Sequence, residues 1–296
     1  MIRKRSKNLI SMQYHKKGLL AETWSRMKTN PGAIFGLAVL VLLILMMLYS
    51  FIFIPYSKVT AMNTAYRFAP PSAQYIFGND NMGRDLFIRI IYGSRYSLAV
   101  GFGAVAIAFV VGTFFGVVAT YYGGVLEEIV MRSSDILASL PALLLGMVIV
   151  VLLGNSLSTL LIAVSVAAVP VFIRMARAAV ISVKNQEFIE ASHAIGMSNF
   201  RIIFTQVLPN GLSPLIVLIS VRMGIAILDA ASLSFIGFGI QAPTPEWGAL
   251  VSSGRDFVIM APHIALFPGL FIMITTFACT LLGDGLRDAL DPKLKK

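Results

Sequence analysis

The sequence predicts an all-α polytopic membrane protein with six transmembrane helices. Hydrophobic residues make up 57% of its 296 residues and charged residues only 13%, whereas an average soluble domain is about a quarter charged. Long apolar runs recur along the chain, and about twenty apolar residues cross the ~30 Å hydrocarbon core of a bilayer. An ordinary soluble fold is therefore not expected.

The first 32 residues are expected to be a cytoplasmic segment that contacts the membrane surface. Several lysines and arginines precede the first apolar run, and the formal net charge of the chain is +10. The basic residues are not interleaved with aromatic ones, so we expect lipid headgroups and not nucleic acid as their partner. Leu19, Leu20, Trp24 and Met27 share one helical face, which predicts a short interfacial helix before Pro31.

Six apolar runs follow, and each is expected to be one span. The first helix (33–55) precedes an extracytoplasmic loop (56–95), a core of five helices (96–284) and a cytoplasmic tail (285–296). The spans within this core are expected at 96–122, 136–153, 156–173, 213–236 and 262–282. Pro141 and Pro170 lie inside two of them and predict kinks, which bundled membrane helices tolerate. Asp135 is expected to cap the third span.

The second span contains Gly112 and Gly116, a GxxxG pair. Such a pair permits close helix packing, either within one subunit or between two. Most of the 24 lysines and arginines fall in the segments that share a side with the N-terminus. The positive-inside rule therefore predicts that both termini are cytoplasmic.

The segment 185–210 is polar to amphipathic and lies between two spans, on the predicted cytoplasmic side. Residues 186–194 are expected to form a helix that ends at Gly196, where a left-handed backbone is needed. Ser198 is expected to cap a second helix, which continues through Val207 and is stopped by Pro209.

Two segments on the other side of the membrane are patterned beyond what a connector needs. In residues 56–95, the residues Gly78, Asn79, Asp80 and Gly83 indicate a turn. Arg84 and Asp85 then begin an amphipathic helix. The second segment, 237–261, contains the run Pro245, Glu246, Trp247 and Gly248.

Arg222 and Asp229 lie inside the fifth span and are seven residues apart, about 700° of helical rotation, so they share a face. A charge at the middle of the bilayer costs on the order of several kcal/mol unless it is paired with an opposite charge or solvated by water. We hypothesise that both residues line the translocation path or a subunit interface. The alternative is a structural ion pair with another helix.

No catalytic or metal site is expected. The sequence has no GxxxxGK[ST] nucleotide loop, no GxSxG and no HExxH. His15, His193 and His263 are scattered, and the single cysteine, Cys279, lies in an apolar run. The chain is therefore expected to bind no cofactor of its own and not to be an enzyme.

The segment 185–210 resembles the EAA motif of ABC importer permeases. Glu190, Ala191, Gly196, Leu208 and Pro209 match that pattern. Ser192 replaces its second alanine. This resemblance implies the type I ABC importer permease fold, in which the segment forms cytoplasmic coupling helices that dock into an ATPase subunit.

The remaining motifs resemble the dipeptide/oligopeptide (peptide/nickel) permease family, and their order resembles its C-type subunit. They are the Phe-Gly-x-Asp-x-x-Gly-Arg-Asp run at 77–85, Leu-Ser-Phe-Ile-Gly-x-Gly at 233–239, Pro-Glu-Trp-Gly at 245–248 and the run at 283–292. The resemblance extends from about Trp24 to the C-terminus. It implies a bacterial cytoplasmic (inner) membrane protein that imports dipeptides or oligopeptides, or else nickel, glutathione or another small solute.

By the same resemblance, the transporter needs a homologous B-type permease, two ABC ATPase subunits that hold ATP and Mg, and an extracytoplasmic solute-binding protein. Glu190 is the candidate polar contact to the ATPase, and His193 is expected to make a surface contact. Phe200, Ile203 and Phe204 are expected to anchor the segment, either to the ATPase or to the protein's own spans.

Two alternative functions belong to other classes of membrane protein. An ion-gradient-driven secondary transporter would have inverted repeats and ion-coupling residues in its spans, and no convincing internal repeat is found. An intramembrane enzyme would need a catalytic dyad or a metal cluster. Whether uptake follows ATP or an ion gradient separates the importer from the secondary transporter.

Overall fold

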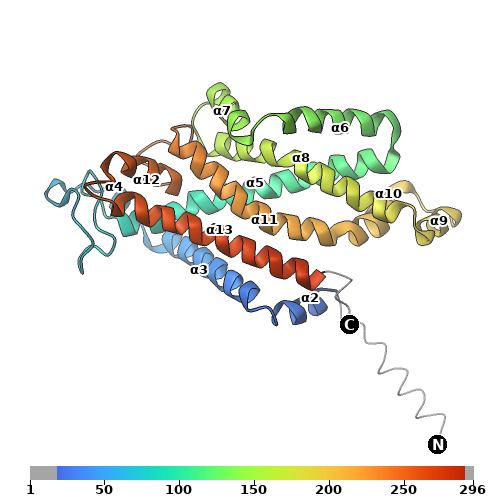
Figure 1. Ribbon diagram of the computed structural model, residues 1–296, viewed down its shortest axis with the longest axis horizontal. Coiled ribbons are helices and arrows are strands. Elements are labelled where there is room, and N and C mark those ends of the chain that lie inside the picture. Colours follow the sequence, from blue (N-terminus) through green and yellow to red (C-terminus); the bar gives the residue numbers. More distant parts are fainter. Residues whose placement is uncertain (1–18, 291–296) are drawn as a thin grey trace, which may run out of the picture.

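The computed structural model describes residues 19–290, which form an elongated bundle of helices (Figure 1). Within these residues, five helices are long and apolar enough to cross a membrane, and a bent pair of helices brings the number of candidate spans to six if the pair crosses as one. The five helices are α3 (Pro31–Phe53), α5 (Leu86–Tyr122), α8 (Leu157–Lys184), α11 (Leu208–Phe235) and α13 (His263–Leu290). The predicted all-α membrane fold is confirmed.

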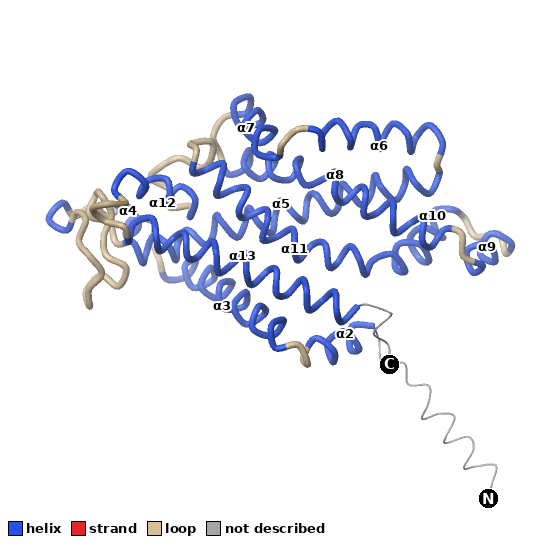
Figure 2. The backbone as a smooth tube through the Cα atoms, viewed as in Figure 1, coloured by secondary structure: helices blue, strands red, loops and turns tan. Residues whose placement is uncertain are grey.

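Shorter elements lie at the two ends of the bundle (Figure 1). Within the described residues Figure 2 shows only helices and loops, and a single isolated β-bridge joins Asn79 and Asp85. The short elements are α2 (Leu19–Met27), α4 (Tyr56–Thr60), η1 (Thr64–Tyr66), α9 (Glu187–Ala194), α10 (Asn199–Ile202), η2 (Ile203–Val207), α12 (Trp247–Gly254) and η3 (Arg255–Phe257).

The predicted interfacial helix before Pro31 corresponds to α2. Met27 is buried against the bundle, whereas Trp24 is 43% exposed and lies under the Lys28 ammonium, 5.1 Å from the ring centroid. The predictions for residues 1–18 and 291–296 lie outside the described residues.

The second span is longer than predicted, because α5 begins at Leu86 and not near residue 96. Asp85 caps it and accepts the Ile88 N–H at 3.2 Å. The amphipathic helix predicted from Arg84 and Asp85 is thus continuous with the span, and the arginines in it are held by neighbouring elements. Arg89 donates to the Val59 carbonyl at 3.1 Å, and Arg95 donates to the Ser50 hydroxyl at 2.7 Å.

The predicted third span is not one straight helix. Helices α6 (Gly124–Ser139) and α7 (Ala142–Leu153) meet at a 92° bend. Pro141 lies at the break, where its missing N–H and its restriction on the preceding residue end a helix. Asp135 lies within α6 and is exposed, 3.6 Å from Arg174. The prediction that Asp135 caps a helix is therefore wrong.

The prediction that Pro209 ends a second helix is also wrong. The chain passes from α10 through the π-helical turn η2 directly into α11, where Pro209 lies in the first turn. The Leu208 N–H reaches back to the Ile203 carbonyl, five residues earlier. Proline is tolerated in a first turn because its missing N–H is not required there.

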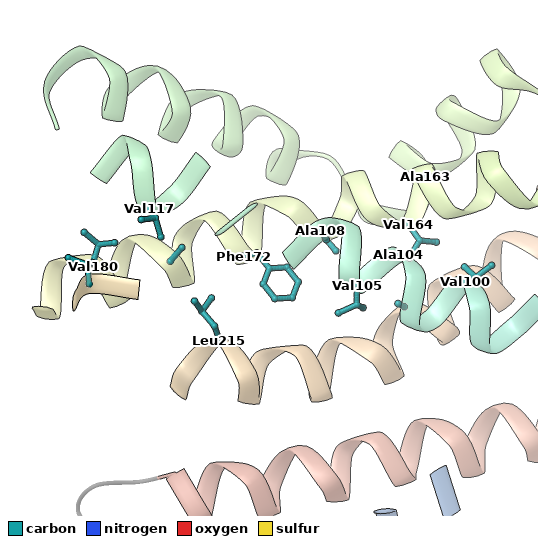
Figure 3. Close-up of a cluster of buried hydrophobic side chains, with 14 of the residues drawn as sticks. Val100, Ala104, Val105, Ala108, Val117, Ala163, Val164, Phe172, Val180 and Leu215 are labelled. Carbon is teal, nitrogen blue, oxygen red and sulfur yellow. The ribbon is translucent and has the colours of Figure 1, made fainter. Parts of the chain in front are cut away.

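The main core lies between α5, α8 and α11, where Figure 3 shows Val105, Phe172 and Leu215 close together. The GxxxG pair of α5 packs here. A β-carbon on Gly112 would lie 2.5 Å from the Phe172 Cβ, and one on Gly116 would lie 2.7 Å from the Ala176 Cβ. The pair therefore serves close packing within one chain.

Candidate functional site

The coupling segment, residues 185–210, forms one end of the bundle, opposite α4 and α12 (Figure 1). Helix α9 buries Ile189 and Ser192, and the Ser192 hydroxyl donates to the Phe188 carbonyl at 2.8 Å. Glu190 and Ala191 face outward and are exposed. The outer face of α9 is thus free to contact another protein.

Gly196 makes the break between the two helices of the segment. Its φ is +78°, a left-handed conformation that costs glycine nothing. Its N–H donates to the His193 carbonyl at 2.9 Å, and the Met197 N–H donates to the Ser192 carbonyl at 3.1 Å. This is the Schellman pattern of a helix end, and the predicted turn at Gly196 is confirmed.

The second helix of the segment, α10, and the π-helical turn η2 that follows it each expose one aromatic ring. Ser198 caps α10, as predicted, and accepts the Arg201 N–H at 3.4 Å. Phe200 is 70% exposed and Phe204 48% exposed, with ring centroids 4.6 Å apart. Ile203 is buried in the bundle's own core. Of the three predicted anchors, Phe200 and Phe204 are therefore available to a partner, and Ile203 is not.

The coupling segment is tied to the end of α5. The Tyr121 hydroxyl lies 3.3 Å from His193 Nε2 in α9 and donates to Asn199 Oδ1 in α10, also at 3.3 Å. The Lys184 ammonium donates to the Tyr121 carbonyl at 2.6 Å. Tyr121 therefore links both short helices to a long one. The sequence carries no signal for this role, because Tyr121 and Tyr122 look equivalent in it.

At the opposite end, the predicted turn in residues 77–85 folds around Asp80. Gly78 and Gly83 have φ of +74° and +72°. The Asp80 carboxylate accepts the Arg84 backbone N–H at 3.0 Å and the Arg84 Nε–H at 2.6 Å. Buried His263, at the start of α13, places its Nε2 3.1 Å from the Asn79 carbonyl oxygen. The turn is thereby fixed against α13.

The run Pro245 to Gly248 packs against the start of α5. Glu246 caps α12: its carboxylate accepts the Gly248 and Ala249 N–H groups at 2.9 Å and the Ser97 hydroxyl at 3.0 Å. Trp247 is fully buried and its indole N–H donates to the Ile90 carbonyl at 2.9 Å. The structure thus brings the two patterned segments of this end together.

Arg222 and Asp229 are both half-buried on α11. Within residues 19–290, neither side chain has an ion pair within 4.0 Å or a hydrogen bond. Neither residue therefore forms a structural ion pair with another helix of the described part of the chain. The same residues contain no group of three or more His, Cys, Asp or Glu side chains that could hold a metal ion.

Comparison with known proteins assigns the family. Residues 108–296 match the profile of the binding-protein-dependent transport system inner membrane component, and residues 18–71 match the N-terminal TM domain of oligopeptide transport permease C. The chain belongs to this permease family. It is therefore a multi-pass membrane subunit of an ABC transporter.

Two groups of relatives match over 274 residues. The dipeptide transport system permease protein of Alkalihalophilus pseudofirmus is 45% identical, over 93% of this chain and 90% of its own length. Glutathione transport system permease proteins of Pectobacterium atrosepticum and Escherichia coli O157:H7 are 38% and 40% identical, each over 93% of this chain. They are matched over 91% and 90% of their own lengths.

Among solved structures, the permease is similar in fold to a chain of the inward-facing MetNI methionine ABC transporter. The TM-score is 0.57 at 21% identity, over 70% of this chain and 98% of that chain. The permease family as a whole works with a permease partner, ATPases and a binding protein, and its members are generally not catalytic.

Proposed function

We propose that this permease is the C-type subunit of an ATP-driven importer of dipeptides or oligopeptides. The observation that carries the substrate class is the 45% identity to a dipeptide permease over 93% of the chain. Glutathione is the second candidate, because relatives named for its transport are 38–40% identical over the same length. Nickel and other small solutes are the remaining classes that the family resemblance implies.

The proposed transporter contains four further parts: a homologous B-type permease, two ABC ATPase subunits that hold ATP and Mg, and an extracytoplasmic solute-binding protein. The permease chain itself carries no catalytic site in this proposal. A second permease is supported by Arg222 and Asp229, half-buried charges that attract each other but form no ion pair within 4.0 Å among the described residues. We place them on the translocation path or at the interface between the two permeases, where water, substrate or a partner side chain compensates their charge.

Coupling to the ATPases is proposed to run through the exposed face of the coupling segment. Glu190 and Ala191 on α9 and Phe200 on α10 point away from the bundle, and aromatic anchors beside a polar contact are typical of protein interfaces. Leu208 and Pro209 sit where η2 enters α11. A displacement of α9 and α10 would therefore move both α11, which continues from them, and α5, which Tyr121 ties to them.

The proposed orientation places the coupling segment and both termini in the cytoplasm of a bacterium, within its inner membrane. In Figure 1, α2, the end of α13 and the coupling segment lie toward the same side of the molecule. Asn30, after α2, donates to Asp288 near the end of α13 at 3.3 Å. The segments with Gly78, Asp80, Glu246 and Trp247 would then face the solute-binding protein.

The deciding experiment is uptake into liposomes that contain the complete complex and its binding protein. The proposal predicts uptake of a labelled dipeptide that requires ATP inside and is unaffected by collapse of ion gradients. Competition with glutathione and with Ni²⁺ ranks the three substrate classes. Uptake that follows an ion gradient and needs no ATPase would support the secondary transporter instead.

A further inference from the structure

Two buried arginines lie at the end of the bundle opposite the coupling segment. Arg84 is 4% exposed and Arg89 is 3% exposed. In residues 19–290, Asp80 is the only carboxylate within 4.0 Å of either one, at 2.6 Å from Arg84 Nε and 3.5 Å from Arg89 Nε. The group therefore holds two positive charges and one negative charge in a place that water hardly reaches.

Part of the hydrogen-bonding capacity of these arginines is unused. Within residues 19–290 the Arg84 side chain donates one hydrogen bond, from its Nε–H to Asp80. Its two Nη atoms form no hydrogen bond with those residues. Arg89 donates through its Nη atoms to the Val59 and Pro243 carbonyls, and its buried Nε has no hydrogen-bond partner. Arginine cannot shed its charge, and an uncompensated buried charge is costly.

A cavity of about 290 Å³ borders both arginines. Its wall includes Ser234, which is 4% exposed and whose hydroxyl also has no hydrogen-bond partner within residues 19–290. Arg255 and Asp256 lie at the rim, exposed and paired with each other at 3.3 Å. The cavity therefore offers buried guanidinium and hydroxyl donors to a group small enough to enter, with an ion pair at its mouth.

We propose that this cavity is a binding site for a carboxylate carried by a small solute. A carboxylate matches guanidinium geometry, forms strong charge-assisted hydrogen bonds and balances the excess positive charge. In a peptide importer the ligand is the C-terminal carboxylate of the peptide, and this identification rests on the proposed function. The site would hold the peptide end at the mouth of the translocation path.

The test measures binding to the purified transporter complex in detergent by titration calorimetry, without its solute-binding protein. The probes are acetate, the dipeptide alanyl-alanine and its C-terminal amide. Variants are made only in this chain, so differences between them report on this cavity. Arg89→Gln removes one guanidinium, and Arg67→Gln is the control: Arg67 lies on an exposed loop at the same end and does not border the cavity.

The proposal predicts that acetate and alanyl-alanine bind the wild type and bind Arg89→Gln about tenfold more weakly or worse. Arg67→Gln should match the wild type, and the amidated peptide should bind about tenfold more weakly than the free acid. Ser234→Ala keeps the test decisive if Arg89→Gln does not fold, because the Ser234 hydroxyl makes no hydrogen bond that folding would lose. It should weaken acetate binding about threefold or more.

Equal acetate affinity in the wild type, Ser234→Ala and any folded Arg89→Gln would overturn the site. Equal affinity for the acid and the amide would overturn the assignment to a peptide carboxylate. Cavity-dependent acetate binding in a complex that imports no peptide would leave the site standing and would refute the proposed function. Peptide import with no cavity-dependent acetate binding would do the reverse.

Discussion

Replacing Gly196 with valine should uncouple the ATPases while leaving the permease folded. Gly196 has φ of +78°, and a β-carbon there would meet nothing within 4 Å. The cost of the substitution is therefore backbone strain alone, roughly 1–2 kcal/mol for an L-residue in the left-handed region. That is small beside a folding free energy of roughly 5–15 kcal/mol.

The strain falls entirely on the turn between α9 and α10. A cost of roughly 1–2 kcal/mol shifts the balance between the native turn and a relaxed one by roughly 5- to 30-fold. We expect substrate-stimulated ATPase activity of the reconstituted complex to fall by a comparable factor, while the thermal midpoint of the permease changes by only a few degrees. Gly196→Asn should retain most of the activity, because asparagine tolerates this conformation.

Gly154→Val is the matched control. Gly154 ends α7 with φ of +83° and ψ of 166°, and a β-carbon at this position would also meet nothing within 4 Å. Few residues other than glycine adopt that conformation, so this variant is strained at least as much, but it lies away from the coupling segment. Normal stimulated ATPase activity in Gly196→Val, or an equal loss in Gly154→Val, would refute the reasoning.

Three further predictions follow from contacts in the bundle. Tyr121→Phe should reduce stimulated ATPase activity at a stability cost of about 1 kcal/mol. Tyr122→Phe should not, because Tyr122 is 57% exposed. Equal activities of the two variants would refute a role for the Tyr121 contacts with His193 and Asn199. Gly116→Ala should lower the thermal midpoint by overpacking against Ala176, at a cost of about 1–3 kcal/mol. Gly269→Ala, in open space on α13, should not lower it. Glu246→Ala should cost about 0.5–2 kcal/mol through the lost α12 cap, and exposed Asp256→Ala should be neutral, both measured by thermal unfolding.

The apolar runs are sufficient to predict which segments are candidate spans, because span length depends on bilayer thickness and not on tertiary contacts. Helix ends are harder to predict. Arg89 and Arg95 make the start of α5 look like an amphipathic helix separate from the span, since their carbonyl and hydroxyl partners lie on segments remote in sequence. Pro209 looks like a helix stop because the π-helical turn before it is invisible in the sequence.

In the candidate sites, too, features set by local sequence are predictable and features set by contacts between distant segments are not. Gly196 and Ser198 are predictable, because glycine at a helix end and serine at a cap act through local backbone geometry. Tyr121 is not, because its role depends on where α9 and α10 fold back onto α5. The charge excess around Asp80 likewise emerges only when Arg84 and Arg89 meet it in space.

The most direct test of the account is gentle detergent extraction of the tagged permease from its native membrane, with identification of every protein that accompanies it. We predict recovery of a homologous permease and nucleotide-binding subunits. The ATPases should be lost from a Phe200→Ala/Phe204→Ala variant and retained in Phe114→Ala, which removes a 56% exposed ring from α5. A stable homo-oligomer without any ATPase, still transporting in liposomes along an ion gradient, would contradict the account.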